Sequence, residues 1–556
     1  MTTAHTPRRT GVAVPDGPAA PSPSRWWRWL HPKHPVLVTT ITAAVLHLVW
    51  ALFLANEGGD LAAQTAWTNF AWDHPSSAYS LAWYGGMHPA SYSIVSPYLM
   101  SVFGIRAVAM VAGTLTAMLT AHLLVRFRAP AALPAGVWVA FALTCNAASG
   151  RVTFGLGLLF ALLATVVAFT RRGTPLLRGA GMGLLGILAT ISSPVAGLFL
   201  MVLAAALILT GRRRAGIALA LGPPLVVGAT TVVFPFSGEQ PISFAAIVAP
   251  SITSVIAIML CAPRQWHLIR VGAGVYLVGI LLTWTIPTPI GSNVERLALL
   301  FGGMLLLIAV ARAPGRLRVG VLSLAFVVTA VWQVVKPVDD LIHTEPAASA
   351  SRHARGLVAE LDALGAAQGR VEVVPLRSHW ESSGLSRDFV LARGWSRQVD
   401  AERNELFYKE GALTPASYRD WLHKWAVQYV VLPEQENDWA AEDEADLVRQ
   451  GQPWLQEVWK DRYWRLYRVA SPTPLADRPA VVQRIRSDEV VLDMTARGTA
   501  LVRISWSPWL SVRDDEGRRT GCIAAEGDFV RMHVPAPGRY HIGGRYELPR
   551  GTPCKD

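Results

Sequence analysis

The chain has 556 residues, of which 52% are hydrophobic and only 16% are charged. Soluble domains carry about 25% charged residues, so this composition excludes an ordinary soluble protein and places much of the chain in lipid. The formal net charge of +12 comes largely from basic residues in short segments between apolar runs. Because these residues form no compact Lys-rich patch, we expect no nucleic-acid partner. Four cysteines are too few for a disulfide scaffold or a cysteine-rich metal site.

The amino-terminal part predicts a tail followed by a membrane anchor. Residues 1–35 are polar and proline-rich, which is typical of a disordered segment. The apolar run Val36–Leu54 is long enough to span a bilayer, which takes about 20 residues. It lacks a small-x-small cleavage site, so we expect a retained signal anchor rather than a removed signal peptide.

Ten further apolar runs predict about eleven crossings in all. Their centres fall near residues 115, 140, 162, 185, 202, 225, 252, 277, 303 and 327. Arginines gather in alternate connecting segments, for example at Arg171, Arg172 and Arg178, while the intervening segments are almost free of Lys and Arg. By the positive-inside rule the amino terminus is cytoplasmic, and an odd number of crossings places everything after about Lys336 outside the cell.

The sequence after the last crossing predicts two extracytoplasmic domains. Short strand candidates at Val371–Pro375, Val427–Leu432 and Trp464–Val469 alternate with helical stretches, which indicates an α/β domain over residues 337–475. Period-2 strands such as Leu501–Trp506 follow, and they predict a β-sandwich over residues 476–556. The expected fold is therefore an α-helical polytopic membrane protein with an α/β plus β-sandwich region. Its predicted parts are a tail (1–35), a transmembrane domain (36–336) with a first external loop (55–92), and these two domains.

The first external loop is the place where we expect chemistry. Gly59 and Asp60 precede a helical pattern over residues 61–72, whose apolar face holds Trp67 and Phe70 and whose polar face holds Gln64. This pattern favours a short helix lying in the membrane interface with its aromatic side toward lipid. Asp ahead of a helix is a favoured N-cap, and the same carboxylate could act as a general base; the sequence leaves both roles open.

Ionisable residues gather at the predicted outer ends of the crossings. They are Asp60, His88, Arg151, Glu295 and Arg296. A transporter would need polar groups near the midplane, which is almost free of charge here. Arginine binds phosphate bidentately, so Arg151 and Arg296 are candidates for holding a lipid phosphate, with interfacial snorkelling as the alternative.

Further residues are candidates for substrate binding. In the first loop these are Glu57, His88 and Tyr92, although His88 can also be an ordinary loop residue. In the α/β region Trp395, Asp400 and Asn404 belong to a segment dense in aromatic and polar groups, which suits carbohydrate and equally suits a solvated helix face.

The four cysteines divide between the two predicted compartments. Cys145 and Cys261 fall in or beside crossings, where a thiol usually behaves as a small hydrophobe. Cys522 and Cys554 fall in the region expected outside, where an oxidising environment lets a disulfide persist. We therefore predict a bridge between Cys522 and Cys554, with two free thiols as the alternative.

The order of these features resembles the integral-membrane GT-C glycosyltransferases of bacterial cell envelopes. The resemblance covers about residues 36–335. It is carried by Gly59-Asp60 after the first crossing, the helix of the first external loop, His88-Pro89 followed by Tyr98 and Phe103–Arg106, and the Ser192–Pro194 break between paired crossings. The part after residue 336 is similar to the extracytoplasmic domains that many such enzymes carry.

The resemblance implies an inverting enzyme that takes a sugar from a polyprenyl-phosphate donor to an envelope glycan or lipid acceptor. The first-loop acid is catalytic in that family, which points to Asp60 here. Many members have a second acid beside it, where this chain has Gly59, so a divalent metal is weakly supported and we expect no cofactor. The alternatives are a transporter or flippase, and a non-catalytic envelope-assembly protein with a carbohydrate-binding exterior.

The predicted orientation is directly testable. Reporter fusions at Arg172 and Arg213 should give a cytoplasmic signal, and a fusion at residue 400 should give an extracytoplasmic one, because of the arginine distribution. A cytoplasmic signal from residue 400 would overturn the orientation and the extracytoplasmic enzyme with it.

Overall fold

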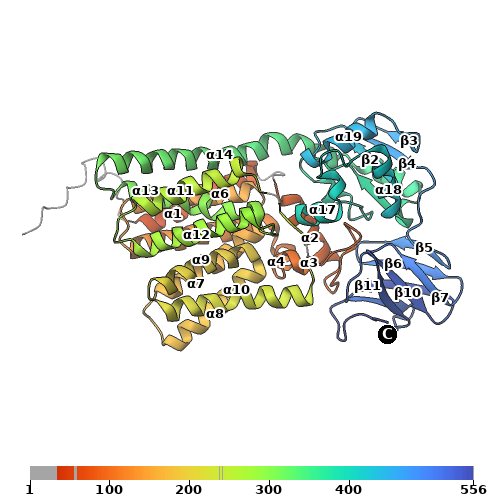
Figure 1. Cartoon of the computed structure of the whole chain (residues 1–556), viewed down its shortest axis with the longest axis horizontal. Helices are drawn as coiled ribbons and strands as arrows, with labels where there is room; N and C mark the ends of the chain where they lie inside the picture. The colour runs from red at the N-terminus through yellow and green to blue at the C-terminus, as the bar shows by residue number, and fades with distance from the viewer. Residues whose placement is uncertain (1–33, 55–58, 237, 241, 555–556) are drawn as a thin grey trace, which may run out of the picture.

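The structure is a computed structural model that describes residues 34–54, 59–236, 238–240 and 242–554. Figure 1 shows a helical bundle at one end of the molecule and a region of mixed α/β and β structure at the other. We call residues 353–554 the C-terminal region. The predicted fold class, an α-helical polytopic membrane protein followed by α/β and β-sandwich parts, is confirmed.

Among the described residues, eight helical segments are long and apolar enough to cross a membrane. They are Pro35–Leu54 (α1, Pro35–Val49, with the π-helix Trp50–Leu54), α5 (Ile105–Arg126), α7 (Val152–Phe169), α8 (Pro175–Ser192), α10 (Arg213–Val233), α12 (His267–Thr285), Gly291–Val310 (ending in α13, Gly303–Val310) and Arg316–Asp339 of α14 (Arg316–Arg352). Three shorter apolar helices accompany them: α6 (Ala132–Ala148), α9 (Pro194–Leu209) and α11 (Ala249–Cys261). Each predicted crossing centre falls within one of these segments, and α8 ends at Ser192 where the sequence predicted a break.

Small residues let the helices of the bundle approach one another. A Cβ at Gly113 of α5 would lie 2.1 Å from Nε2 of His47 on α1, and one at Gly136 of α6 would lie 2.2 Å from Oγ1 of Thr39. Glycine is therefore required at both contacts. Close approach of this kind replaces the hydrophobic driving force, which is absent between helices in lipid.

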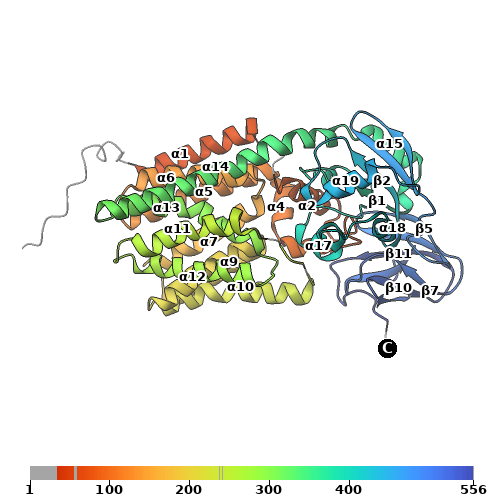
Figure 2. The same cartoon turned by 45° about the horizontal axis from the view of Figure 1, so that its top comes forward.

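Helix α14 connects the bundle to the C-terminal region. Its 37 residues correspond to about 55 Å at 1.5 Å per residue, which is more than a bilayer core requires. Figures 1 and 2 show it running along the bundle and reaching the C-terminal region. The two ends of the molecule are thus joined by a continuous helix.

The C-terminal region begins with an α/β part. Its elements are α15 (Arg355–Ala363), β1 (Arg370–Val373), α16 (Glu381–Gly384), α17 (Arg397–Arg403), α18 (Pro415–Lys424), β2 (Val427–Pro433), α19 (Glu442–Arg449), β3 (Leu455–Lys460) and β4 (Trp464–Val469). The sheet order is β1-β2-β4-β3, with β1 and β2 parallel and the other pairs antiparallel. The three strand candidates of the sequence correspond to β1, β2 and β4.

A β-sandwich follows. Its strands are β5 (Ala480–Ile485), β6 (Glu489–Met494), β7 (Gly498–Val502), β8 (Leu510–Asp514), β9 (Cys522–Glu526), β10 (Phe529–Val534) and β11 (Gly538–Gly544). They form the sheets β5-β6-β11-β8 and β7-β10-β9, which share one apolar core. The predicted strand Leu501–Trp506 is wrong in its second half, because the chain leaves the sheet after Val502 and Ser505 donates its N–H to Gly85 O of the first loop, 2.8 Å away.

The last residues of the sandwich are tied to its sheet. Cys522 and Cys554 are joined by a disulfide, with their Cα atoms 4.7 Å apart. The backbone N–H of Cys554 also donates to Ile523 O at 3.0 Å. The bridge therefore holds the end of the chain against β9.

The aromatic face of the first-loop helix does not face lipid as predicted. The first loop forms α2 (Leu61–Asp73), α3 (Pro89–Tyr92) and α4 (Ser96–Phe103). Trp67 of α2 is only 2% exposed and packs edge-on against Trp83, with ring centroids 4.8 Å apart, and Gln64 on the polar face is also buried. The aromatic face of α2 thus meets the core of the α/β part instead of lipid. Amphipathicity shows that a face must be covered, but it does not show what covers it.

The same loop also enters the sandwich. Tyr79 and Leu81 belong to the core of the sandwich, and Ala78 donates its N–H to Gly544 O at 2.9 Å. On the membrane side, Trp509 of the sandwich donates from Nε1 to Val233 O at the end of α10, at 2.7 Å. The first loop therefore lies between the bundle and both parts of the C-terminal region.

Candidate active site

Asp60 is held in place by the connection between α6 and α7. Its backbone N–H donates to Ser149 O at 3.1 Å. One turn further along α2, the buried Gln64 accepts from the N–H of Thr153 at 3.0 Å and donates to Gly150 O. These bonds pair backbone groups at the break between the two membrane helices and fix the start of α2 beside them.

The carboxylate of Asp60 pairs with Arg296. Arg296 Nη2 lies 3.2 Å from Asp60 Oδ2, and the Asp60 side chain is 33% exposed. Asp60 makes no side-chain cap bond to α2, so the capping role is wrong. Among the described residues the second carboxylate oxygen, Oδ1, has no hydrogen-bond partner. One oxygen is thus oriented by a cation, and the other can accept a proton.

A second ionic group adjoins the first. Glu295 is nearly fully buried, and its Oε1 lies 3.2 Å from Arg151 Nη2 and 2.8 Å from Lys336 Nζ. Together with Asp60 and Arg296, these residues give three cations and two carboxylates, a net charge of +1. Two cations sharing one carboxylate leave positive charge available for an anion.

A small pocket opens beside these cations. Its lining includes all three cations but neither carboxylate. The polar lining residues are Asn146, Ser149, Arg151, Arg296, Gln333 and Lys336. Nε of Arg296 is buried without a hydrogen-bond partner among the described residues. The pocket therefore offers donors and positive charge to an anion.

Tyr92 belongs to this site, whereas Glu57 lies outside the described residues. Burial and the negative charge of Asp60 raise the pKa of the Tyr92 hydroxyl, and Gln64 and Arg296 act on it in the opposite direction. The structure thus brings together Asp60, Tyr92, Arg151 and Arg296 of the predicted site residues. Lys336 is a further residue of this site that the sequence did not predict, because in the sequence it only marks the end of the last apolar run. The available signal was a lysine at a predicted outer helix end, in a chain whose predicted outer connecting segments are almost free of Lys and Arg.

His88 is not positioned to bind substrate. Its ring is buried between Tyr79 and Phe234, with Nδ1 2.9 Å from Ala78 O and Nε2 3.1 Å from Oγ of Ser507. Burial lowers its pKa to about 4. Both ring nitrogens are engaged, so His88 joins the first loop to the sandwich, and the substrate-binding prediction is corrected.

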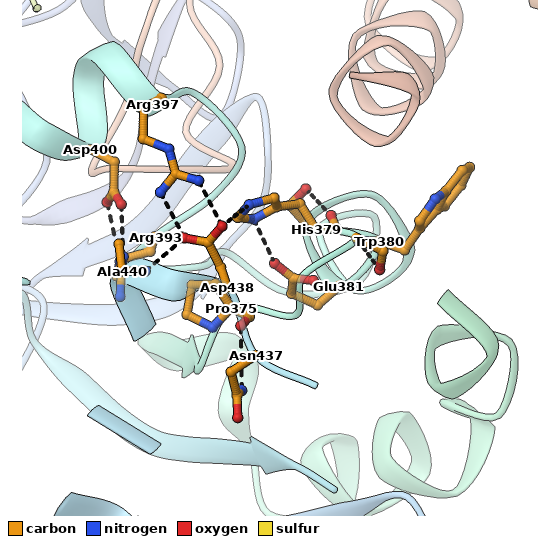
Figure 3. Close-up of polar contacts among 12 residues, drawn as sticks. Pro375, His379, Trp380, Glu381, Arg393, Arg397, Asp400, Asn437, Asp438 and Ala440 are labelled. Atoms are coloured by element: carbon orange, nitrogen blue, oxygen red, sulfur yellow. Dashed lines mark hydrogen bonds and ion pairs between the residues drawn. The ribbon is translucent and has the colours of Figure 1, made fainter. Parts of the chain in front are cut away.

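Asp400 and Asn404 are also structural residues. Asp400 is buried, and Arg393 binds its two oxygens at 3.1 and 2.7 Å, as Figure 3 shows. Asn404 and Tyr408 donate to the same carboxylate at 2.8 and 2.6 Å. Burial alone would raise the pKa of Asp400, but the ion pair with Arg393 outweighs it and lowers the pKa. Neither residue faces a ligand, because the buried network uses their polar atoms.

Trp395 stacks on a buried histidine. Its ring centroid lies 3.6 Å from that of His379. His379 Nε2 is 3.3 Å from Asp438 Oδ2, and its Nδ1 is 3.5 Å from Glu381 Oε1. Figure 3 shows Arg397 meeting the same Asp438, with two contacts of 2.7 Å. His379 thus occupies one face of the Trp395 ring, which corrects the prediction that Trp395 binds substrate.

The His379 cluster was not visible in the sequence, because its members are separated by up to 59 residues. Burial lowers the pKa of His379, but the hydrogen bond and charge of Asp438 outweigh it, so the pKa lies above 6.5. Asp438 responds in the opposite direction: burial would raise its pKa, and Arg397 lowers it. Among the described residues no group of three or more His, Cys, Asp or Glu side chains is placed to hold a metal ion.

Comparisons with known proteins give one family and several distant structural likenesses. A family described as a domain of unknown function (DUF8823) matches residues 477–556, the sandwich. No curated protein matches the chain. The arabinofuranosyltransferase AftD from Mycobacteria is similar with a TM-score of 0.46 and 14% identity, over 84% of this chain and 41% of AftD. ArnT from Cupriavidus metallidurans in the apo state has a TM-score of 0.38 and 14% identity, over 78% of this chain and 97% of ArnT. The chain therefore spans about two fifths of the AftD structure.

The His379 cluster predicts a pH-dependent stability. Because the folded-state pKa of His379 is raised, its stabilisation is complete below pH 6.5 and is lost as the pH rises through that higher pKa. Asp438, whose pKa is lowered, keeps its contribution above pH 3.8 and loses it only in acid. The thermal midpoint of the wild type should therefore approach that of His379→Gln as the pH rises above 6.5. The exposed His533→Gln serves as a control, and a constant difference between wild type and His379→Gln would contradict the expectation.

Proposed function

We propose that the chain is a membrane glycosyltransferase that moves a sugar from a polyprenyl-phosphate donor to a glycan or lipid acceptor of the cell envelope. The observation that carries this proposal is the ion pair of Asp60 with Arg296 beside the cation-lined pocket. A base for a hydroxyl and a binding site for a phosphate thus stand next to each other, at one end of the membrane helices.

Asp60 is the general base in this proposal. Its Oδ1 takes the proton of the acceptor hydroxyl while that oxygen attacks the anomeric carbon of the donor sugar. The bond between the anomeric carbon and the phosphate oxygen breaks, and its electron pair leaves with the phosphate. Direct displacement of this kind inverts the anomeric centre. The pair with Arg296 keeps the other carboxylate oxygen fixed, so that Oδ1 is presented in one orientation.

The cations bind and stabilise the phosphate. Negative charge grows on the leaving phosphate as the bond breaks, and preorganised donors that face such charge typically make the largest contribution to catalysis. Arg151, Arg296 and Lys336 line the pocket from three different helical segments, and Glu295 orients Arg151 and Lys336. The lipid chain of the donor would extend along the helices in the bilayer while its phosphate occupies the pocket.

The orientation of the enzyme follows from the arginine distribution. With arginine-rich connections in the cytoplasm, the pocket and the C-terminal region lie on the outer side of the membrane. A polyprenyl-phosphate donor suits this side, because it carries both the sugar and its own leaving group without a nucleotide. The site uses no cofactor in this proposal.

Asp60→Asn tests the base. The amide cannot accept the proton of the acceptor, so sugar transfer from the donor should fall by about 10²–10⁴-fold. Transfer is measured with the full chain in lipid nanodiscs, and donor binding is measured on the same samples. The matched control is Asp528→Asn in the turn between β9 and β10, where the carboxylate is 62% exposed. If Asp60→Asn transferred sugar at the wild-type rate, Asp60 would not be the catalytic base.

Substitution of the cations tests the phosphate site. Arg151→Ala, Arg296→Ala and Lys336→Gln should each weaken binding of the polyprenyl-phosphate donor by about 1.5–3 kcal/mol, the usual contribution of a hydrogen bond to a charged group. This corresponds to roughly tenfold or more in Kd for each variant. Lys424→Gln, at an exposed position on α18, is the control for loss of a positive charge. If donor affinity were unchanged in all three variants, the cations would serve only to pair the carboxylates.

A further inference from the structure

A second pocket lies at the other end of α2. It is partly open to solvent, so a ligand seated in it could extend outward along the surface. Asn69 and Phe70 line it from α2, Ser80 from the first loop, Ser386 from the α/β part and Ser487 from the sandwich. Three parts of the chain that are distant in sequence therefore build one pocket.

The walls of this pocket are rigid. Trp67 and Trp83 pack edge-on behind it, with ring centroids 4.8 Å apart. His74 is held by Asp488, 3.2 Å from its Nδ1, and by Oγ of Ser487, 3.2 Å from its Nε2. Side chains fixed in this way present a preformed surface, which reduces the ordering entropy that a ligand must overcome.

Several polar groups of the pocket are available to a ligand. Among the described residues the carboxamide of Asn69 and the hydroxyl of Ser386 have no hydrogen-bond partner. These groups offer both donors and acceptors, and all of them are uncharged.

The charges at this pocket cancel. Its lining carboxylate, Asp73, lies 3.0 Å from the guanidinium of Arg387, and no other Asp, Glu, Lys or Arg lines it. The pocket beside Asp60 has the opposite character, because three cations and no carboxylate line it. One pocket therefore suits an anion, and the other suits a neutral ligand with many hydroxyl groups.

We infer that the second pocket binds an uncharged saccharide of the acceptor glycan, a role that rests on the proposed function. Amide and hydroxyl groups beside apolar aromatic walls match the alternation of hydroxyls and C–H faces on a sugar. Phe70 stands ten residues after Asp60 along α2, which is about 15 Å at 1.5 Å per residue. A short oligosaccharide spans such a distance, so one end of the acceptor lies in this pocket while its terminal hydroxyl reaches Asp60.

Binding of labelled sugars to the full chain in lipid nanodiscs tests this inference. The probes are linear, uncharged tetrasaccharides of arabinose, mannose, galactose and glucose, each labelled at its reducing end. Ala66→Leu narrows the pocket, and Asn69→Ala and Ser386→Ala each remove a free polar group. Gln450→Ala removes an exposed amide elsewhere and is the matched control.

We expect saturable binding of at least one tetrasaccharide, weakened by about three- to tenfold in Asn69→Ala and Ser386→Ala, as for loss of one neutral hydrogen bond, and unchanged in Gln450→Ala. Inorganic phosphate should not compete. Absence of binding for all four probes, competition by phosphate, or equal affinity in all pocket variants and the control would overturn the inference. The thermal midpoint of each variant shows whether it is folded. If Ala66→Leu does not fold, Asn69→Ala and Ser386→Ala decide the outcome.

The Asp60→Asn variant separates this inference from the proposed function. Its sugar binding should still depend on the second pocket, which Asp60 does not line: adding Asn69→Ala or Ser386→Ala to Asp60→Asn should weaken tetrasaccharide binding by the same factor as in the wild-type background. If Asp60→Asn transfers sugar at the wild-type rate while sugar binding still depends on the second pocket, Asp60 is not the catalytic base but the saccharide site stands. If Asp60→Asn loses transfer while no sugar binding depends on the second pocket, the catalytic role of Asp60 stands and the saccharide site is excluded.

Discussion

Charged side chains at the edge of a bilayer must be paired, and this constraint organises the candidate active site. Taking a charge out of water costs several kcal/mol, and removing one partner of a buried pair costs about 3–5 kcal/mol. Glu295 meets the constraint by holding both Arg151 and Lys336, and Arg296 meets it through Asp60. Because cations outnumber carboxylates by one, the pairing leaves a pocket with a net positive charge. In the proposed function, the same arrangement that stabilises the helix ends also binds the phosphate of the donor.

The first loop connects the ionic site to the C-terminal region. Its helix α2 begins at the ionic site, where Gln64 bonds to the connection between α6 and α7. Its other end lies against Trp83 and the α/β core, and the following residues, including Tyr79, enter the core of the sandwich. The C-terminal region is thus packed directly on the element that carries Asp60. An acceptor held by that region would be placed relative to the base by one short, buried helix.

Much of the fold could be predicted because it depends on local patterns. Apolar length identified the membrane helices, and strand periodicity identified β1, β2 and β4. The position of Asp60 ahead of α2 was also predictable, as was the gathering of Arg151 and Arg296 at helix ends. The partners of these residues were not, because the pair between Asp60 and Arg296 joins positions 236 residues apart. The burial of Trp67, His88 and Asp400 was missed for the same reason: a polar or aromatic residue looks alike in sequence whether it faces a ligand or another part of the chain.

The most direct test is a structure of the Asp60→Asn variant in lipid with a polyprenyl-phosphate sugar bound, since this variant should bind the donor without consuming it. If the proposed function is right, the phosphate lies in the pocket among Arg151, Arg296 and Lys336, and the anomeric carbon of the sugar faces residue 60. A donor whose phosphate lies away from all three cations, or whose sugar faces away from residue 60, would contradict it.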